Sequence, residues 1–330
     1  MKLIKNVKLL NEENVDVLID KNKIIDISKD INVKIDNVID AGGMYVLSGQ
    51  VNAYFDGTLK DASRLLSQGV TAVYDFANDE KVTKYLVDSG IKVYKAIGDF
   101  NGQTLIDENF INTEVKKWLS VGVKNIILYA LSPNMSEEST YEILLNYASK
   151  KGYLLATHAS ENLEDVGEID KVYGLSPIGL LESYGFFDFK NMIIDCVYVD
   201  KDDVELLKNY DTTICSCSTK NLRSGNGIAP TYSFIKNNIN VVLGGVSSNH
   251  FKELSLLSDL QSGTLNEKGI ISDSQILNIN SNNFHLFNDI GCLEVGGYAD
   301  IVIVDENDIL NLTPLNVKMV FIDGECRYKI

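Results

Sequence analysis

The sequence predicts an α/β protein, a (β/α)8 TIM barrel with a small β-sandwich domain formed by both chain ends. Two patterns support this prediction. Through most of the chain, short apolar runs rich in strand-forming residues alternate with segments of helix-forming composition, as in a parallel sheet covered by helices. Near both ends, apolar and polar residues alternate instead, as they do in antiparallel hairpins.

The region expected to form the barrel contains eight apolar runs, and eight strands within about 200 residues indicate a closed barrel. Each run is followed by a helix-forming segment, such as residues 136–152, where Ser136 is the expected N-cap and Gly152 the expected end. The expected strands are residues 45–53, 71–77, 91–98, 125–131, 153–158, 191–198, 212–218 and 240–247.

The two chain ends are predicted to form one further structural unit. The alternating stretches near the start are KLIKNVKLL and VDVLIDKNKIIDI, and those near the end are ADIVIVDEN and NVKMVFIDGECRYKI. We therefore expect a composite small β-domain from residues 1–46 plus 293–330, beside a barrel formed by residues 47–292.

Composition limits the location and the partners. With 46 acidic against 30 basic residues, the net charge of -16 repels phosphate backbones and anionic lipid, so we expect neither nucleic acid nor a membrane as a partner. We see no bilayer-length apolar run and no signal peptide, which predicts a cytoplasmic protein. The five cysteines lack CxxC spacing, which favours reduced thiols over disulfides or a zinc knuckle.

Seven segments, in chain order, resemble the amidohydrolase superfamily, in particular its deaminase and chlorohydrolase branch. LSGQVNAYFD at residues 47–56 resembles the first-strand signature PG-x-[VI]-[ND]-x-H-x-H, and CSTKNLRSGNGIAP at 217–230 resembles the strand-7 pattern C-P-x-S-N. The other matching segments are ATHASE at 156–161, MIIDCVYVDKDDVELL at 192–207, VVLGGVSSN at 241–249, GCLEVGGYADIVIVDEN at 291–307 and NVKMVFIDGE at 316–325.

The resemblance implies one divalent metal ion held by three His and one Asp, with a Glu that moves protons. In this chain the two first-strand His positions are Tyr54 and Asp56, and the strand-5 His is kept as His158. The strand-8 Asp position is Val246, and Glu161 matches the proton-transferring carboxylate.

Two further residues complete the expected pocket. Asp195 stands where the resemblance implies a strand-6 His beside the water, and Asn221 lies in the strand-7 segment. Asp195 and Glu161 are therefore the candidate catalytic residues. The expected pocket consists of Tyr54, Asp56, His158, Glu161, Asp195, Asn221 and Val246.

The substitutions predict that no metal cofactor is held tightly. Val246 offers no donor atom, and the phenol of Tyr54, with an ordinary pKa of about 10, is a poor ligand at neutral pH. His158 and Asp56 are the remaining ligand candidates. Asp195 is a candidate replacement, since strand 6 lies next to strand 5, so a weakly held zinc, iron or manganese ion is compatible with these three side chains.

Structural roles stay open for the same side chains. His158 is equally well explained as a barrel-top His bonded to its neighbours, and Glu161 as a surface acid or a cap. Asp56 and Asp195 are explained as solvated or salt-bridged loop carboxylates. His250 has no partner at ligand spacing in the sequence and is expected to be structural.

Two functions follow from these observations. The first is an amidohydrolase-like protein that is impaired or inactive and keeps only small-molecule binding or a place in an assembly. The second is an active metal-dependent hydrolase or deaminase of C–N or C–Cl bonds in cyclic substrates, with a site of Asp56, His158 and Asp195. The sequence favours the first. The resemblance also allows a homodimer, although no interface can be read from the sequence.

Overall fold

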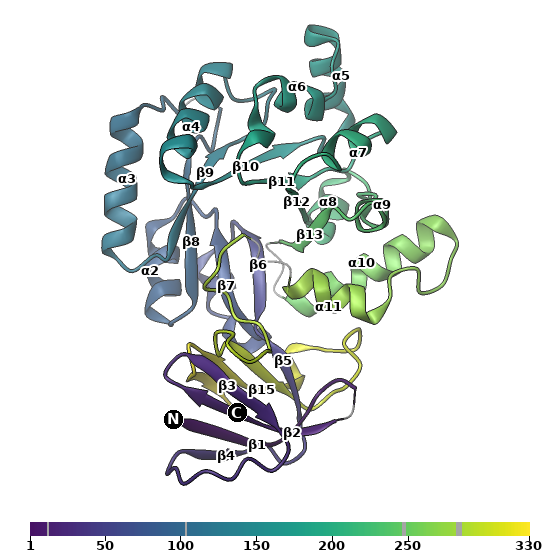
Figure 1. Ribbon diagram of the computed structural model, residues 1–330. Coiled ribbons are helices and arrows are strands. Elements are labelled where there is room, and N and C mark those ends of the chain that lie inside the picture. The colour runs from purple at the N-terminus through teal and green to yellow at the C-terminus, as the bar shows by residue number, and fades with distance from the viewer. Residues whose placement is uncertain (12, 103, 246–248, 282–285) are drawn as a thin grey trace.

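The structure is a computed structural model that describes residues 1–11, 13–102, 104–245, 249–281 and 286–330. It contains two eight-stranded sheets, one a parallel barrel and the other a smaller mixed sheet (Figure 1). The predicted TIM barrel with a small domain built from both chain ends is therefore confirmed. Among the described helices, none combines the length and apolarity that a bilayer span requires.

The barrel strands follow one another in chain order, and each is parallel to its neighbours. At the end of the ladder, the Gly245 N–H donates to the Tyr54 carbonyl at 2.8 Å, and the Asn52 amide donates to the Gly245 carbonyl at 2.8 Å. These two bonds connect the last strand to the first. The strands are β6 (Gln50–Phe55), β7 (Val70–Asp75), β8 (Lys92–Gly98), β9 (Asn125–Ala130), β10 (Leu154–Ala159), β11 (Asn191–Asp195), β12 (Thr212–Ser216) and β13 (Asn240–Leu243).

Helices surround the barrel because each buries one apolar face against the strands. In α3, for example, Ile111, Val115 and Trp118 recur at helical spacing and are buried, while Asp107 caps the first turn by accepting from the Phe110 N–H. The helices are α1 (Leu59–Ala62), α2 (Glu80–Asp88), α3 (Glu108–Ser120), α4 (Glu138–Lys151), α5 (Leu163–Tyr173), α6 (Pro177–Ser183), α7 (Lys201–Leu207), α8 (Ser218–Ser224), α9 (Thr231–Lys236), α10 (His250–Leu265) and α11 (Asp273–Ser281).

The barrel interior is a packed core. Small and large side chains from the strands alternate there, and the segment after α11 contributes Leu286, Phe287 and Ile290 to the same cluster. Phe287 stacks on Tyr94, with ring centroids 4.0 Å apart. A filled interior leaves the C-terminal ends of the strands as the place for chemistry.

The small sheet brings the two ends of the chain together, beside the barrel (Figure 1). Strand β5 pairs antiparallel with β14, with Ser48 opposite Ile301, so the chain enters and leaves the barrel from neighbouring strands. The sheet consists of β1 (Lys2–Lys8), β2 (Asn14–Asp20), β3 (Lys23–Ser28), β4 (Val38–Asp40), β5 (Tyr45–Ser48), β14 (Ile301–Val304), β15 (Val317–Ile322) and β16 (Glu325–Lys329).

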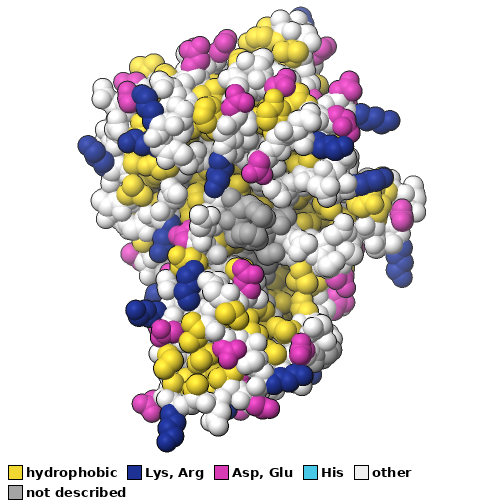
Figure 2. All heavy atoms as spheres, viewed as in Figure 1, with side chains coloured by type: hydrophobic (Ala, Val, Ile, Leu, Met, Phe, Trp, Pro, Cys, Tyr) yellow, Lys and Arg dark blue, Asp and Glu magenta, His cyan; other side chains and the backbone are white. Residues whose placement is uncertain are grey.

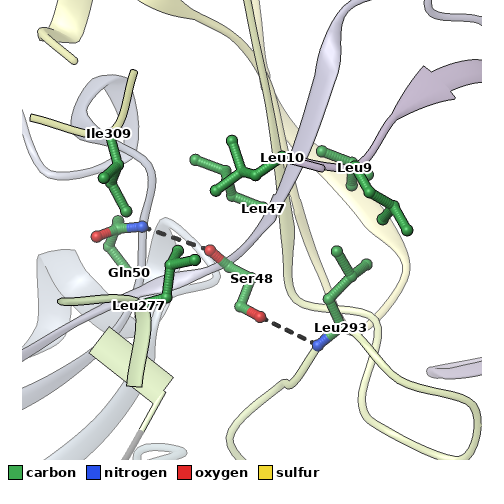
Figure 3. A pocket seen from close by; sticks show the side chains of 9 residues that line it. Leu9, Leu10, Leu47, Ser48, Gln50, Leu277, Leu293 and Ile309 are labelled. Atoms are coloured by element: carbon green, nitrogen blue, oxygen red, sulfur yellow. Dashed lines mark hydrogen bonds between the residues drawn. The ribbon is translucent and has the colours of Figure 1, made fainter. Parts of the chain in front are cut away.

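An apolar cavity lies at the junction of the two sheets (Figure 3). Leu47 and Leu293 line it from the small-sheet side, and Leu277 comes from α11. The Ser48 hydroxyl accepts from the Leu293 N–H at 3.0 Å, and the Gln50 amide donates to the Ser48 carbonyl at 3.4 Å. This cavity is thus mainly apolar, with few polar contacts.

Two local predictions are wrong. Residues 45–53 do not form one strand, because Gly49 separates β5 from β6; a Cβ there would lie 2.1 Å from Thr71 Oγ1. Ser136 does not cap α4, because the N-cap of that helix is Glu137. The Ser136 hydroxyl donates to Asp99 instead. The predicted domain boundaries stay a prediction, and the one at residues 46–47 falls within β5.

Candidate functional site

The centre of the candidate site is a bonded pair at the C-terminal ends of two neighbouring strands. Ala159 of β10 lies opposite Asp195 of β11 in the ladder. His158 Nδ1 and Asp195 Oδ2 are 2.6 Å apart, and both side chains are buried. Because an ionised carboxylate can only accept, the imidazole donates from Nδ1, which leaves the lone pair of a neutral ring on Nε2.

The backbone at this pair is held in an unfavourable conformation. Ser160, Asp195 and Cys196 have φ values of 53°, 81° and 48°, in the left-handed region that non-glycine residues rarely adopt. The Ser160 carbonyl accepts from the N–H groups of Val197 and Tyr198 at 3.0 and 2.9 Å, which ties the two strand ends together. Strain retained at strand ends is typical of functional sites.

A lysine from α8 completes the cluster. Lys220 Nζ lies 2.7 Å from Glu161 Oε1 and 3.0 Å from Asp195 Oδ2. Asn226 also donates to Glu161 Oε1, at 2.8 Å. Glu161 Oε2 lies 3.8 Å from His158 Nδ1. One ammonium therefore bridges the two carboxylates that flank the histidine.

The electrostatics favour the charged forms of the lysine and of the buried aspartate. Burial raises the pKa of Asp195, but the attraction of His158 and Lys220 outweighs it and holds that pKa below its ordinary value. Burial similarly lowers the pKa of Lys220, while Asp195 and Glu161 hold it above its ordinary value. The site thus contains an ionised aspartate paired with an ammonium.

Aromatic rings form one wall of the site. The ring of Tyr54 meets His158 edge-on, with centroids 5.1 Å apart, and also contacts Phe76, which in turn contacts Tyr129. Burial raises the pKa of Tyr54, so its phenol stays protonated at neutral pH. That hydroxyl donates to Asp56 at 3.2 Å.

The predicted site residues are not all brought together. His158, Glu161 and Asp195 form one group, whereas Asp56 is exposed and contacts the hydroxyl of Tyr54. Asn221 follows Lys220 on α8 and is buried, and its side-chain oxygen has no hydrogen-bond partner in the described part of the chain. Val246 lies outside the described residues.

The grouped residues have the chemistry of a small cation site. One ligand atom each from His158, Glu161 and Asp195 lies within 4.8 Å of the others, and catalytic zinc sites use three protein ligands. Asp195 Oδ1 is buried and has no hydrogen-bond partner within the described ranges, which leaves it available to a ligand. These residues therefore fit a divalent metal. Compared with the ligands predicted from the sequence, which were Asp56, His158 and Asp195, Glu161 replaces Asp56.

Lys220 and Asn226 are functional candidates that the sequence analysis missed. Their contacts join the segments that follow β10 and β12, so spacing along the chain does not reveal them. One signal was present: Lys220 occupies the fourth position of CSTKN, where the C-P-x-S-N pattern has serine. A charged residue at a pocket position where a small hydroxyl is the rule indicates altered chemistry.

The chain is a (β/α)8 barrel with ionisable side chains at the C-terminal ends of its strands. It therefore belongs to the class of TIM-barrel proteins whose functional sites lie at that end of the barrel. The model of the amidohydrolase family matches residues 46–327, so the chain belongs to the amidohydrolase family. This finding confirms the resemblance seen in the sequence.

Curated relatives match most of this chain at moderate identity. The chain is 27% identical to a 5-methylthioadenosine/S-adenosylhomocysteine deaminase of Caldicellulosiruptor saccharolyticus, over 82% of this chain and 68% of the relative. It is 25% identical to a 5'-deoxyadenosine deaminase of Methanococcus aeolicus, over 96% of this chain and 90% of the relative.

Solved structures show the same fold. An adenosine deaminase from Xanthomonas campestris with bound zinc superposes with a TM-score of 0.86 at 15% identity, covering 98% of this chain and 92% of that one. An atrazine chlorohydrolase from Arthrobacter aurescens, complexed with zinc, gives 0.82 at 19% identity, covering 99% and 95%. The curated relatives are named as deaminases, so the comparisons do not support the loss of activity that the sequence analysis preferred.

Proposed function

We propose that this chain is a hydrolase of the deaminase branch that replaces the exocyclic amino group of a purine nucleoside or a related nitrogen ring with oxygen from water, releasing ammonia. The observation that carries the proposal is the group of His158, Glu161 and Asp195 at the ends of β10 and β11. The names of the curated relatives support 5'-modified adenosines as the first substrates to test.

His158, Asp195 and Glu161 would hold the divalent metal, which when bound lowers the pKa of a water molecule toward neutrality. In the metal-free chain, Asp195 orients His158 through the 2.6 Å contact. Glu161 is about a quarter exposed, with 23% of its side chain accessible, so it can reach both the buried pair and a bound ring. With one oxygen of Glu161 on the metal, we assign its other carboxylate oxygen proton transfer to the ring and to the leaving amine.

Neighbouring rings support binding of a flat heterocycle. Tyr54, Phe76 and Tyr129 surround His158 on the side of β6, β7 and β9, and Phe100 contacts Tyr129 at 5.0 Å between centroids. Aromatic side chains favour offset or edge-on contacts with other rings. An aromatic wall next to polar groups is typical of a pocket for a nitrogen ring.

The test is ammonia release by purified protein supplied with zinc, manganese or iron(II). We expect turnover of 5'-methylthioadenosine, S-adenosylhomocysteine or 5'-deoxyadenosine, and a fall of about 100-fold or more in kcat for Glu161→Gln, because general acid–base transfer contributes that much. Glu164→Gln, on the exposed first turn of α5, is the matched control and should leave kcat unchanged.

A second candidate is favoured by one observation, the ion pairs of Lys220 with both Glu161 and Asp195. With its carboxylates neutralised, the site would bind a small molecule without hydrolysing it. Absence of ammonia from all three nucleosides with every metal, together with saturable binding of one of them, would reject the hydrolase and leave this candidate.

A further inference from the structure

Lys220 occupies a position in the site that a cation would otherwise take. Its ammonium contacts Glu161 Oε1 and Asp195 Oδ2, which belong to two of the three residues that could hold a metal. The side chain is mostly buried, with 18% exposed, and Nζ lies over the ring of Tyr54, 5.8 Å from the ring centroid. The contact is therefore an internal one, with little solvent around it.

An ammonium and a divalent metal cannot share these oxygens at close range. A metal ion binds carboxylate oxygens at about 2.0–2.2 Å, so it would stand next to an ammonium that is itself about 3 Å from the same atom. Like charges at such a distance repel strongly where solvent is largely excluded. Occupation by one cation therefore requires the other to move away.

The flexible stem makes that movement feasible. Lysine has four methylene groups between the backbone and the ammonium, and its rotamers interconvert freely when the charge has no fixed partner. Asn226 would still donate to Glu161 after the lysine has left, so the loop after β10 keeps one of its two restraints. The backbone at β10 and β11 is bonded independently of Lys220 through the Ser160 carbonyl.

We propose that Lys220 is the resident cation of this site and competes with a divalent metal ion for Glu161 and Asp195. This inference rests on the proposed function for the identity of the metal-binding residues. In the metal-free chain the lysine neutralises both carboxylates, and metal binds only as the lysine leaves. Lys220 is thus the residue that sets metal affinity, through charge and not through ligation.

Calorimetric titration of zinc into metal-free protein tests the proposal. Lys220→Met keeps a stem of similar volume and removes the charge, and we expect it to lower the Kd for zinc at least about tenfold. Lys220→Arg keeps the charge and should give no gain. Lys208→Met, which removes a lysine paired with the exposed Glu205, should leave the Kd unchanged.

Adding Asp195→Asn to Lys220→Met should abolish the gain, because the competed oxygen atom is then no longer an anion. A folded Lys220→Met protein, checked by circular dichroism and gel filtration, with a Kd equal to or weaker than that of the wild type would overturn the proposal. Lys220→Ser serves as a second neutral variant if the methionine protein does not fold.

Wild-type protein gives an independent readout. Acetic anhydride modifies free amines, so labelling of Lys220, followed by mass spectrometry, should rise several-fold with added zinc, while Lys208 stays unchanged. Labelling of Lys220 that stays constant or falls with zinc would contradict competition. Neither measurement uses turnover, so tighter zinc binding without ammonia release would reject the hydrolase and leave the role of Lys220 intact.

Discussion

At the scale of single residues, His250 is the clearest titrating group outside the site. It begins α10, is 2% exposed, and its Nε2 has no hydrogen-bond partner within the described residues. Burial lowers its pKa to about 4, because a charged imidazole would lose its hydration there. The folded state therefore holds this ring neutral, in agreement with the structural role expected from the sequence.

This burial predicts an acid-dependent loss of stability. Between the unfolded pKa of about 6.5 and the folded value, the unfolded chain binds a proton that the folded chain does not, so stability falls as pH decreases through that range. Relative to His250→Gln, the wild type should lose up to about 3 kcal/mol between pH 7 and pH 4. Urea unfolding of both proteins at several pH values measures the free energy of unfolding of each. A difference between the two proteins that does not change with pH would show that His250 does not titrate on unfolding.

The candidate site was predictable in part. Three residues named from the sequence, His158, Glu161 and Asp195, form one group because the ends of adjacent strands meet at the same face. The contacts of Lys220, and the separation of Asp56 from this group, depend on how side chains pack between segments that follow different strands. No spacing along the chain encodes those distances.

At the scale of elements, Gly98 shows how a strand end constrains the sequence. It ends β8 with φ of 145°, and a Cβ would lie 1.9 Å from the Tyr129 carbonyl oxygen of β9. That oxygen already accepts from the Asp99 N–H at 2.9 Å. A side chain at residue 98 therefore pushes two paired strands apart.

We expect Gly98→Ala to destabilise the protein by more than about 2 kcal/mol, since backbone must shift to admit the methyl group. Gly152→Ala is the matched control: it also has positive φ, at 69°, but no atom of the described residues lies within 4 Å of its Cβ position. That change should cost about 1 kcal/mol from conformation alone. If both variants lose the same free energy of unfolding in chemical denaturation, a small backbone shift is enough to remove the contact with Tyr129.

Element types were easier to predict than their limits. Gly152 ends α4 in the left-handed conformation, as expected from a glycine after a helical run. Gly49 was not recognised as a break, because the apolar pattern continues across it while the chain passes from one sheet to the other. Periodicity reports burial, and the buried residues of β5, Val46 and Leu47, run on into the fully buried β6.

At the scale of the whole molecule, Lys92 fastens the barrel to the small sheet. This buried β8 residue lies 2.7 Å from Asp300, just before β14, and donates to the Asp289 carbonyl at 2.5 Å. The other oxygen of Asp300 accepts from the Asp323 N–H at 2.8 Å. Figure 2 shows that acidic and basic side chains on the outer face it draws are, in contrast, interspersed and exposed to solvent.

Lys92→Met should lower the free energy of unfolding by about 3–5 kcal/mol, because Asp300 is left as an unpaired buried charge. Combining it with Asp300→Asn removes this buried charge as well and should recover part of the loss, although Asp323, partly exposed and 2.9 Å from Lys92 Nζ in the wild type, is unchanged. Thermal and urea denaturation of the single and double variants measure this. A double variant no more stable than Lys92→Met would show that lost packing, not the unpaired charge, dominates.

The pairing of β5 with β14 also has a consequence for assembly. Topologically the whole barrel is a loop inserted into an antiparallel hairpin, closed where Ser48 meets Ile301. Closing so long an unstructured loop has a large entropic cost, whereas the same closure is nearly free once the barrel has condensed and brings the two strands together. During synthesis, the edge of β5 therefore stays unpaired until β14 has been synthesised and pairs with it.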